Sequence, residues 1–168
     1  MINLESRVRA MRAFLWFFRG STLLYVAIGW LIYRLLGGHG GLVNLPRSTY
    51  LLVLVVMALA GAATVGVLTF FLPARLTNPE RLAQLPGMNR RSAVVAQLQR
   101  AFMIAVSGAN LVAMLGLVLF LLNGQMPHLI AFTLAALIVL GMTTPEQERW
   151  EETVRAVRAR RSDWVDVW

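Results

Sequence analysis

The chain has 168 residues, of which 58% are hydrophobic, and its formal net charge at neutral pH is +8. The mean hydropathy of +0.64 is too high for an ordinary soluble domain and is typical of an integral membrane protein. There is no cysteine, which excludes disulfides, thiol catalysis and cysteine-ligated metal sites. All 16 basic residues are arginine and most flank apolar runs, so the charge indicates membrane-flanking loops and no nucleic-acid partner.

One stretch of sequence recurs in the second half of the chain. The triplet Arg12-Ala13-Phe14 opens a long apolar run, and the same triplet, Arg100-Ala101-Phe102, opens another. Gly108 follows the second triplet at the offset at which Gly20 follows the first. Each run leads through a turn into a second apolar run. The pattern predicts an all-α integral membrane protein with four transmembrane helices, arranged as two tandem, parallel hairpins that arose by duplication.

The first predicted hairpin occupies residues 1–78. It begins with an amphipathic lead-in that continues into a span over residues 13–36, which is long enough to cross a bilayer. The glycine-rich run over residues 37–41 ends this span, because glycine disfavours helix. A second span is predicted over residues 50–72, and Pro73 is expected to end it.

A cytoplasmic amphipathic linker is predicted over residues 79–99, where Asn78 caps a short helix that has proline at its first position. The second hairpin occupies residues 100–143, and its first span ends at Asn123. Its second span, over residues 128–142, is short for a bilayer unless the helix includes the residues on either side.

The last segment, residues 144–168, is predicted to form one amphipathic helix capped by Thr144. Large or basic residues recur at helical spacing along its apolar stripe. They are Trp150, Arg161, Trp164 and Trp168. A tryptophan-edged stripe is typical of a helix that lies on the membrane surface or on a partner protein.

The distribution of arginine predicts the topology. The N-terminal segment and the central linker are rich in arginine, whereas the two hairpin tips contain one charged residue, Arg47. The positive-inside rule then places both termini and the central linker in the cytoplasm. We expect a multi-pass protein of the cell inner (plasma) membrane.

Small residues recur every four positions on three of the predicted spans, which lets helix backbones approach one another closely. They are Ala58, Ala62 and Gly66 on the second span, Ala105, Ala109 and Ala113 on the third, and Ala131 and Ala135 on the fourth. We expect these stripes to form the helix–helix interfaces.

The first span is instead rich in aromatic residues, including Trp16 and Trp30 near its two boundaries. Such rings form interfacial belts that face lipid. Alternatively they line a groove for a flat apolar ligand such as a quinone, a carotenoid or a lipid tail. No cofactor is predicted beyond these candidates.

Arg19 is the most costly residue to place in a membrane, because it lies two helical turns, about 9–10 Å, inside the first span. Its side chain is expected to extend to the headgroups. Alternatively it binds a lipid phosphate or a carboxylate on a partner subunit.

Asn110 lies near the middle of the third span, where an amide must find a partner. An interhelical hydrogen bond to Thr64 or Thr22 would satisfy it. Alternatively Asn110, Ser107 and Thr64 line a pore.

The sequence contains no nucleophile–base pair, phosphate-binding loop or pair of carboxylates, and no Asp or Glu lies inside a span, so we predict neither an enzyme nor a metal site. The preferred hypothesis is a non-catalytic accessory or scaffolding subunit of a larger inner-membrane complex, energy-transducing or transport-related. Its partners would be other membrane subunits and the lipid bilayer. The alternatives are a small oligomeric channel or transporter that uses Asn110, and a lipid- or quinone-binding protein that uses Trp16 and Arg19.

Overall fold

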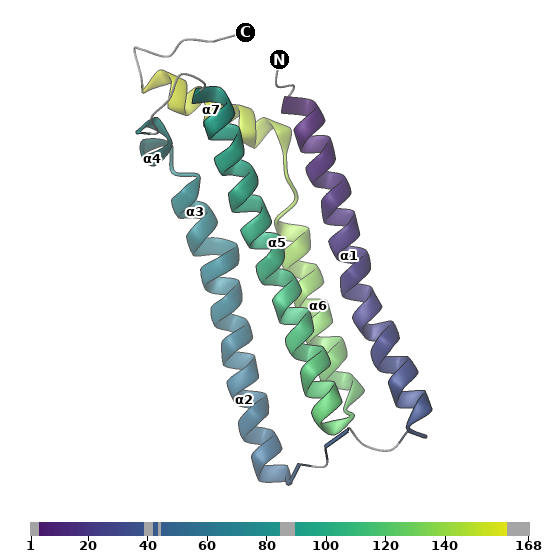
Figure 1. Ribbon diagram of the computed structural model, residues 1–168. Coiled ribbons are helices and arrows are strands. Elements are labelled where there is room, and N and C mark those ends of the chain that lie inside the picture. Colours follow the sequence, from purple (N-terminus) through teal and green to yellow (C-terminus); the bar gives the residue numbers. More distant parts are fainter. Residues whose placement is uncertain (1–3, 39–41, 44, 85–89, 161–168) are drawn as a thin grey trace.

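The computed structural model describes residues 4–38, 42–43, 45–84 and 90–160, which form an all-α structure (Figure 1). Most of the helices run side by side along one axis, and short helices lie at one end. In chain order they are α1 (Leu4–Leu35), α2 (Arg47–Thr64), the π-helix η1 (Val65–Phe71), α3 (Leu72–Leu76), α4 (Pro79–Ala83), α5 (Arg90–Asn123), α6 (Met126–Met142) and α7 (Gln147–Ala159). We call the end that carries α4 and α7 the α7 end.

Among the described residues, three helical runs are long and apolar enough to cross a membrane: α1, the continuous run α2–η1–α3, and α5. The fourth candidate, α6, has 17 residues and would make a span together with α7, from which it is bent by 54°. The helix begins at Met126 and so includes residues before the predicted start of this span. These candidate spans indicate a multi-pass membrane protein.

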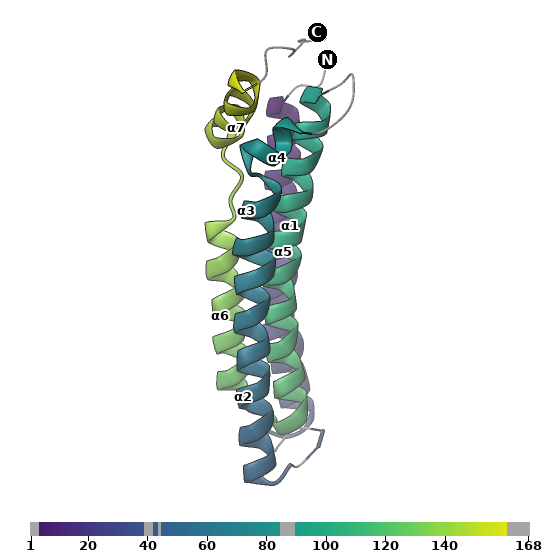
Figure 2. The same cartoon turned by 90° about the vertical axis from the view of Figure 1, so that its left-hand side faces the viewer.

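Helix α5 lies at the centre of the bundle. Figures 1 and 2 show α1 and the α2–η1–α3 run on opposite sides of it, with α6 alongside. The predicted small-residue stripe of α5 is confirmed as an interface, because Ala105, Ala109 and Ala113 are buried. Two glycines also mark close crossings: a Cβ on Gly108 would lie 2.8 Å from the Leu68 Cβ of η1, and one on Gly116 would lie 2.5 Å from the Phe132 Cβ of α6.

The two predicted hairpins are packed differently. Helices α5 and α6 pack along their length, whereas α1 and α2 lie on opposite sides of α5 (Figure 2). Leu42, between α1 and α2 in the sequence, lies at the end of α5, where its N–H donates to the Leu121 carbonyl at 2.7 Å. Packing on α5 thus takes the place of packing between α1 and α2.

The stripes predicted on the second and fourth spans do not form helix–helix interfaces within the chain. Ala58, Ala62 and Gly66 are exposed, and α2 is instead buried at Tyr50 and Gly61. On α6, likewise, two alanines of the predicted stripe are exposed, and buried residues lie on the other face. A four-residue repeat of small side chains permits close approach, but the neighbouring helices decide which face is used.

The helix of the second span continues through Pro73 to Leu76, whereas Pro73 was expected to end it. Proline has no N–H to donate and its ring crowds the preceding turn. The π-helix Val65–Phe71 ends two residues before Pro73, and the wider turns of the π-helix relieve this crowding. The expected cap downstream is confirmed, since the Asn78 side chain accepts a hydrogen bond from the Glu80 N–H at 2.9 Å.

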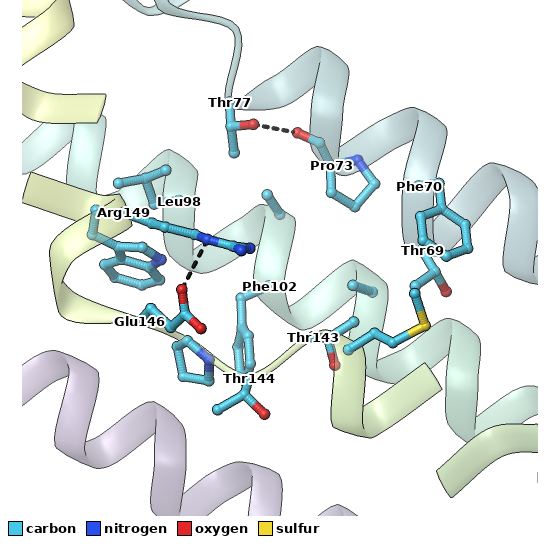
Figure 3. Close-up of a pocket in the computed structure, with 15 residues that line it drawn as sticks. Thr69, Phe70, Pro73, Thr77, Leu98, Phe102, Thr143, Thr144, Glu146 and Arg149 are labelled. Carbon is cyan, nitrogen blue, oxygen red and sulfur yellow. Dashed lines mark hydrogen bonds and ion pairs between the residues drawn. The ribbon is translucent and has the colours of Figure 1, made fainter. Parts of the chain in front are cut away.

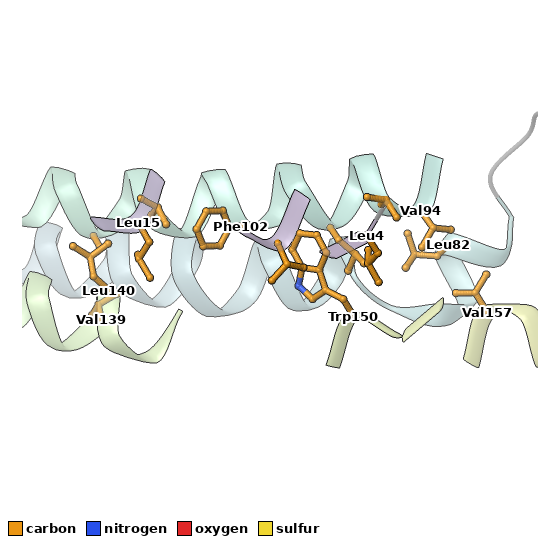
Figure 4. Close-up of a cluster of buried hydrophobic side chains, with 14 residues drawn as sticks. Leu4, Leu15, Leu82, Val94, Phe102, Val139, Leu140, Trp150 and Val157 are labelled. Atoms are coloured by element: carbon orange, nitrogen blue, oxygen red, sulfur yellow. The ribbon is translucent and has the colours of Figure 1, made fainter. Parts of the chain in front are cut away.

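Helix α7 begins at Gln147, later than the predicted cap at Thr144. The Thr144 hydroxyl donates to the Gly141 carbonyl at 2.9 Å, so this side chain binds the last turn of α6 and does not cap α7. The apolar face of α7 is covered by the chain itself, because Trp150 and Val157 are buried in a cluster with Leu4 and Leu82 (Figure 4). This part of the predicted membrane- or partner-binding stripe is therefore occupied internally.

The substitution Gly116→Val tests the crossing of α5 and α6. The added side chain would collide with the base of Phe132, so we expect a loss of about 1–3 kcal/mol in the free energy of unfolding. The measurement is the midpoint of thermal unfolding in detergent, followed by circular dichroism.

Gly20→Val is the matched control, because a Cβ at Gly20 meets no atom of the described residues within 4 Å. Equal destabilisation by the two substitutions would contradict the close crossing, since it would reflect helix propensity alone.

Candidate functional site

The described residues form a cleft at the α7 end, which we call the interfacial cleft (Figure 3). Its volume is about 410 Å³. One wall comes from η1 and α3, the opposite wall from the end of α6 and the start of α7, and the floor from α5. The lining residues are Thr69, Phe70, Pro73, Thr77, Leu98, Ala101, Phe102, Ala105, Met142, Thr143, Thr144, Pro145, Glu146, Arg149 and Trp150.

The floor of the interfacial cleft is apolar and is kept open by small side chains. Ala101 and Ala105 of α5 lie at its base beside Leu98 and Phe102. Because alanine is short, the α2–η1–α3 run and α6 both pack on α5 without closing the space between them. The result is a cleft with an apolar base and a polar rim, which suits an amphipathic ligand.

Thr69 is the buried polar group of this cleft that has no partner. The hydroxyls of Thr77, Thr143 and Thr144 donate to backbone carbonyls of their own helices at 2.9, 3.2 and 2.9 Å. The Thr69 hydroxyl finds no hydrogen-bond partner among the described residues, although the residue is only 6% exposed. A buried unsatisfied hydroxyl is costly, and an acceptor that entered the cleft would satisfy it.

Two charged residues lie at the other end of the cleft (Figure 3). The Nε of Arg149 is 2.8 Å from an oxygen of Glu146, and both side chains are more than half exposed. An arginine has further N–H groups on its terminal nitrogens, and within the described residues these make no hydrogen bond. Arg149 can therefore take a second anionic partner without losing its first.

Arg19 has partners within the chain. Its Nη2 donates to the Leu140 carbonyl and to the Thr144 hydroxyl, both at 3.4 Å, and its guanidinium lies 5.0 Å from the centre of the Trp16 ring. A cation at the C-terminus of a helix is favoured by the helix dipole and by the free carbonyls. Arg19 thus lies at the level where α6 ends, and the α6–α7 linker supplies the partner that the sequence did not reveal.

The tryptophans of the first span point away from the bundle. Trp16 is 68% exposed and Trp30 is 51% exposed. Arg34 stacks on Trp30 at 4.8 Å, as Arg19 does on Trp16 at the other end of the span. Exposed rings that stack with arginine are what an interfacial belt requires.

Asn110 is bound by Tyr25 of α1, whose hydroxyl accepts from its Nδ2 at 3.4 Å. The sequence instead suggested Thr64 or Thr22, but the Thr22 hydroxyl donates to the Phe18 carbonyl at 2.8 Å. The Asn110 Oδ1 has no partner among the described residues.

At the other end of the bundle, Tyr50 and His128 share a 2.7 Å hydrogen bond. His39, the second histidine of the sequence, lies outside the described residues. Within the described part of the chain, no group of three or more His, Asp or Glu side chains could hold a metal ion.

The C-terminal candidates divide into two sets. Trp150 lies between the buried cluster and the interfacial cleft. Arg161, Trp164 and Trp168 lie outside the described residues.

Sequence reasoning did not single out Thr69 or Arg149. The sequence signal that could have identified Thr69 is Pro73, which lies four residues later within an apolar run.

Comparisons of the chain with protein-family models, with curated proteins and with solved structures find no match.

Arg19→Gln tests the link between α1 and the end of α6. We expect hydrogen exchange in the last turn of α6, including the Thr143 amide that donates to the Val139 carbonyl at 3.1 Å, to become about five-fold faster. The measurement is hydrogen–deuterium exchange with mass spectrometry in detergent. Arg34→Gln is the control, because it removes the same kind of stacked arginine at the far end of α1. Equal effects of the two substitutions on this turn would contradict the assignment.

Proposed function

We propose that the chain is a non-catalytic accessory or scaffolding subunit of a larger inner-membrane complex, energy-transducing or transport-related. In this proposal the α7 end is cytoplasmic and the spans form two hairpins that arose by duplication. The arginine-rich central linker and the positive-inside rule support that orientation.

One observation carries the proposal: the outer surface of the α2–η1–α3 run is uncovered, and a stripe of small residues runs along it. Only 6% of the most apolar window of this run is buried, compared with 50% for α5. Ala58, Ala62 and Gly66 form a stripe on the exposed surface, and a Cβ at Gly66 would meet no described atom within 4 Å. The partner would be a transmembrane helix of another subunit that packs along this stripe.

The chemistry of the spans supports a non-catalytic role. No Asp or Glu occurs between Ser6 and Pro79 or between Arg81 and Pro145. Ion-coupled transport usually depends on an intramembrane carboxylate that binds and releases the ion, so energy conversion would reside in the partner subunits.

The alternative of a small oligomeric channel receives less support from the arrangement of polar groups. Asn110 faces Tyr25 of α1, whereas Thr64 belongs to α2, on the other side of α5. Polar residues on opposite sides of a central helix do not line one path within a protomer.

Ala62→Leu tests the stripe. The larger side chain would prevent close approach of a partner helix, so we expect about ten-fold less partner to co-purify with the tagged chain from native membranes in mild detergent. The readout is native gel electrophoresis followed by mass spectrometry. Ala27→Leu makes the same change at an exposed position on α1, on the opposite side of the bundle, and should leave recovery unchanged. If the wild-type chain migrates alone, the proposal fails.

A further inference from the structure

We infer that the interfacial cleft is a binding site for one phospholipid of the surrounding bilayer. Thr69 donates a hydrogen bond to an ester carbonyl of the lipid, and Arg149 binds its phosphate. This inference does not depend on the proposed function, since it concerns a different surface of the molecule.

The position of the cleft fits the junction of a lipid head with its tails. The cleft lies where α6 ends at Met142 and gives way to a polar linker, so it occupies the level at which an apolar span meets the interface. Trp150 lines the same cleft, and tryptophan is the residue that favours this level. A lipid chain would enter from the side, between η1 and the end of α6.

Thr69 supplies the hydrogen bond that the interior of the cleft otherwise lacks. Its hydroxyl is a buried donor without an acceptor, and a lipid ester carbonyl is an acceptor that carries no donor of its own. The π-helix that contains Thr69 and the proline four residues later both depart from regular α-helix, and π-helical segments are frequent at functional sites.

Arg149 supplies the charge at the opposite end of the cleft. Its Nε is bound to Glu146, and its terminal nitrogens present the forked donor pair that recognises phosphate oxygens. A ligand that bridges Thr69 and Arg149 needs an uncharged acceptor and an anionic group, joined across the Leu98 and Phe102 floor. A glycerophospholipid has both groups.

A second groove of similar size shows what distinguishes the interfacial cleft. It lies between α1 and α5, has a volume of about 420 Å³, and is lined by residues that include Met11, Gln99 and Met103. The Gln99 side chain there already accepts a hydrogen bond from Arg7 at 2.9 Å. The interfacial cleft combines its apolar floor with a buried hydroxyl that has no such partner.

The test is native mass spectrometry of the full chain, stripped of lipid in detergent and titrated with three compounds. Dioleoylphosphatidylglycerol carries both groups, its ether-linked analogue lacks the ester carbonyls, and dioleoylglycerol lacks the phosphate. Thr69→Val removes the donor and keeps the shape of the side chain. Since the hydroxyl has no partner in the described structure, the fold should tolerate its loss.

Thr133→Val is the matched control, because Thr133 is also buried without a partner and lies outside the interfacial cleft. We expect Thr69→Val to weaken binding of the ester lipid about five-fold and to leave the ether lipid unaffected. Thr133→Val should change neither. Equal effects of the two substitutions, or an ether lipid that binds as tightly as the ester lipid, would overturn the assignment of Thr69.

Arg149→Gln separates the two ends of the ligand. We expect about ten-fold weaker binding of dioleoylphosphatidylglycerol and unchanged binding of dioleoylglycerol, because the second compound has no phosphate to lose. If a short-chain quinone binds with an affinity that depends on Thr69 while the phospholipid does not, the occupant is a quinone and the phospholipid proposal is wrong.

Discussion

The packing of α5 is the constraint on which the rest of the structure depends. A single helix accepts neighbours on several sides only if the backbones can approach closely, and in a membrane the hydrophobic effect does not drive that approach. Ala105, Ala109 and Ala113, together with Gly108 and Gly116, provide the necessary space. This space on α5 allows α1, α2 and α6 to pack against it. The interfacial cleft follows as well, because its floor is the part of α5 where small residues separate two neighbours that do not meet.

The two ends of the molecule differ in how they satisfy polar groups. At the α7 end, Arg19 completes the last turn of α6, and α7 folds back so that Trp150 covers the core. At this end α7 therefore contacts α1, α4 and α5, which lie far from it in the sequence. In its midst one hydroxyl, that of Thr69, is left without a partner among the described residues. A buried polar group that lacks a hydrogen-bond partner marks a candidate binding site.

The sequence was sufficient to predict what depends on local composition. The presence of the long apolar helices, the amphipathic character of α7 and the Asn78 cap all follow from neighbouring residues. It was insufficient where distant residues decide. Gly20 and Gly108 occupy equivalent positions in the repeated stretch, yet a Cβ would be free at the first and would collide with η1 at the second. The same reason explains why Ala58 was misplaced at an interface, and why neither Thr69 nor the partner of Arg19 could be identified.

The packing of α1 and α2 on α5 has a consequence for biogenesis. Since α1 and α2 pack on α5 rather than on each other, the first two spans enter the membrane before either has its main protein neighbour. The contacts that hold the first two spans in the bundle therefore depend on α5 and α6, which lie in the C-terminal half of the chain.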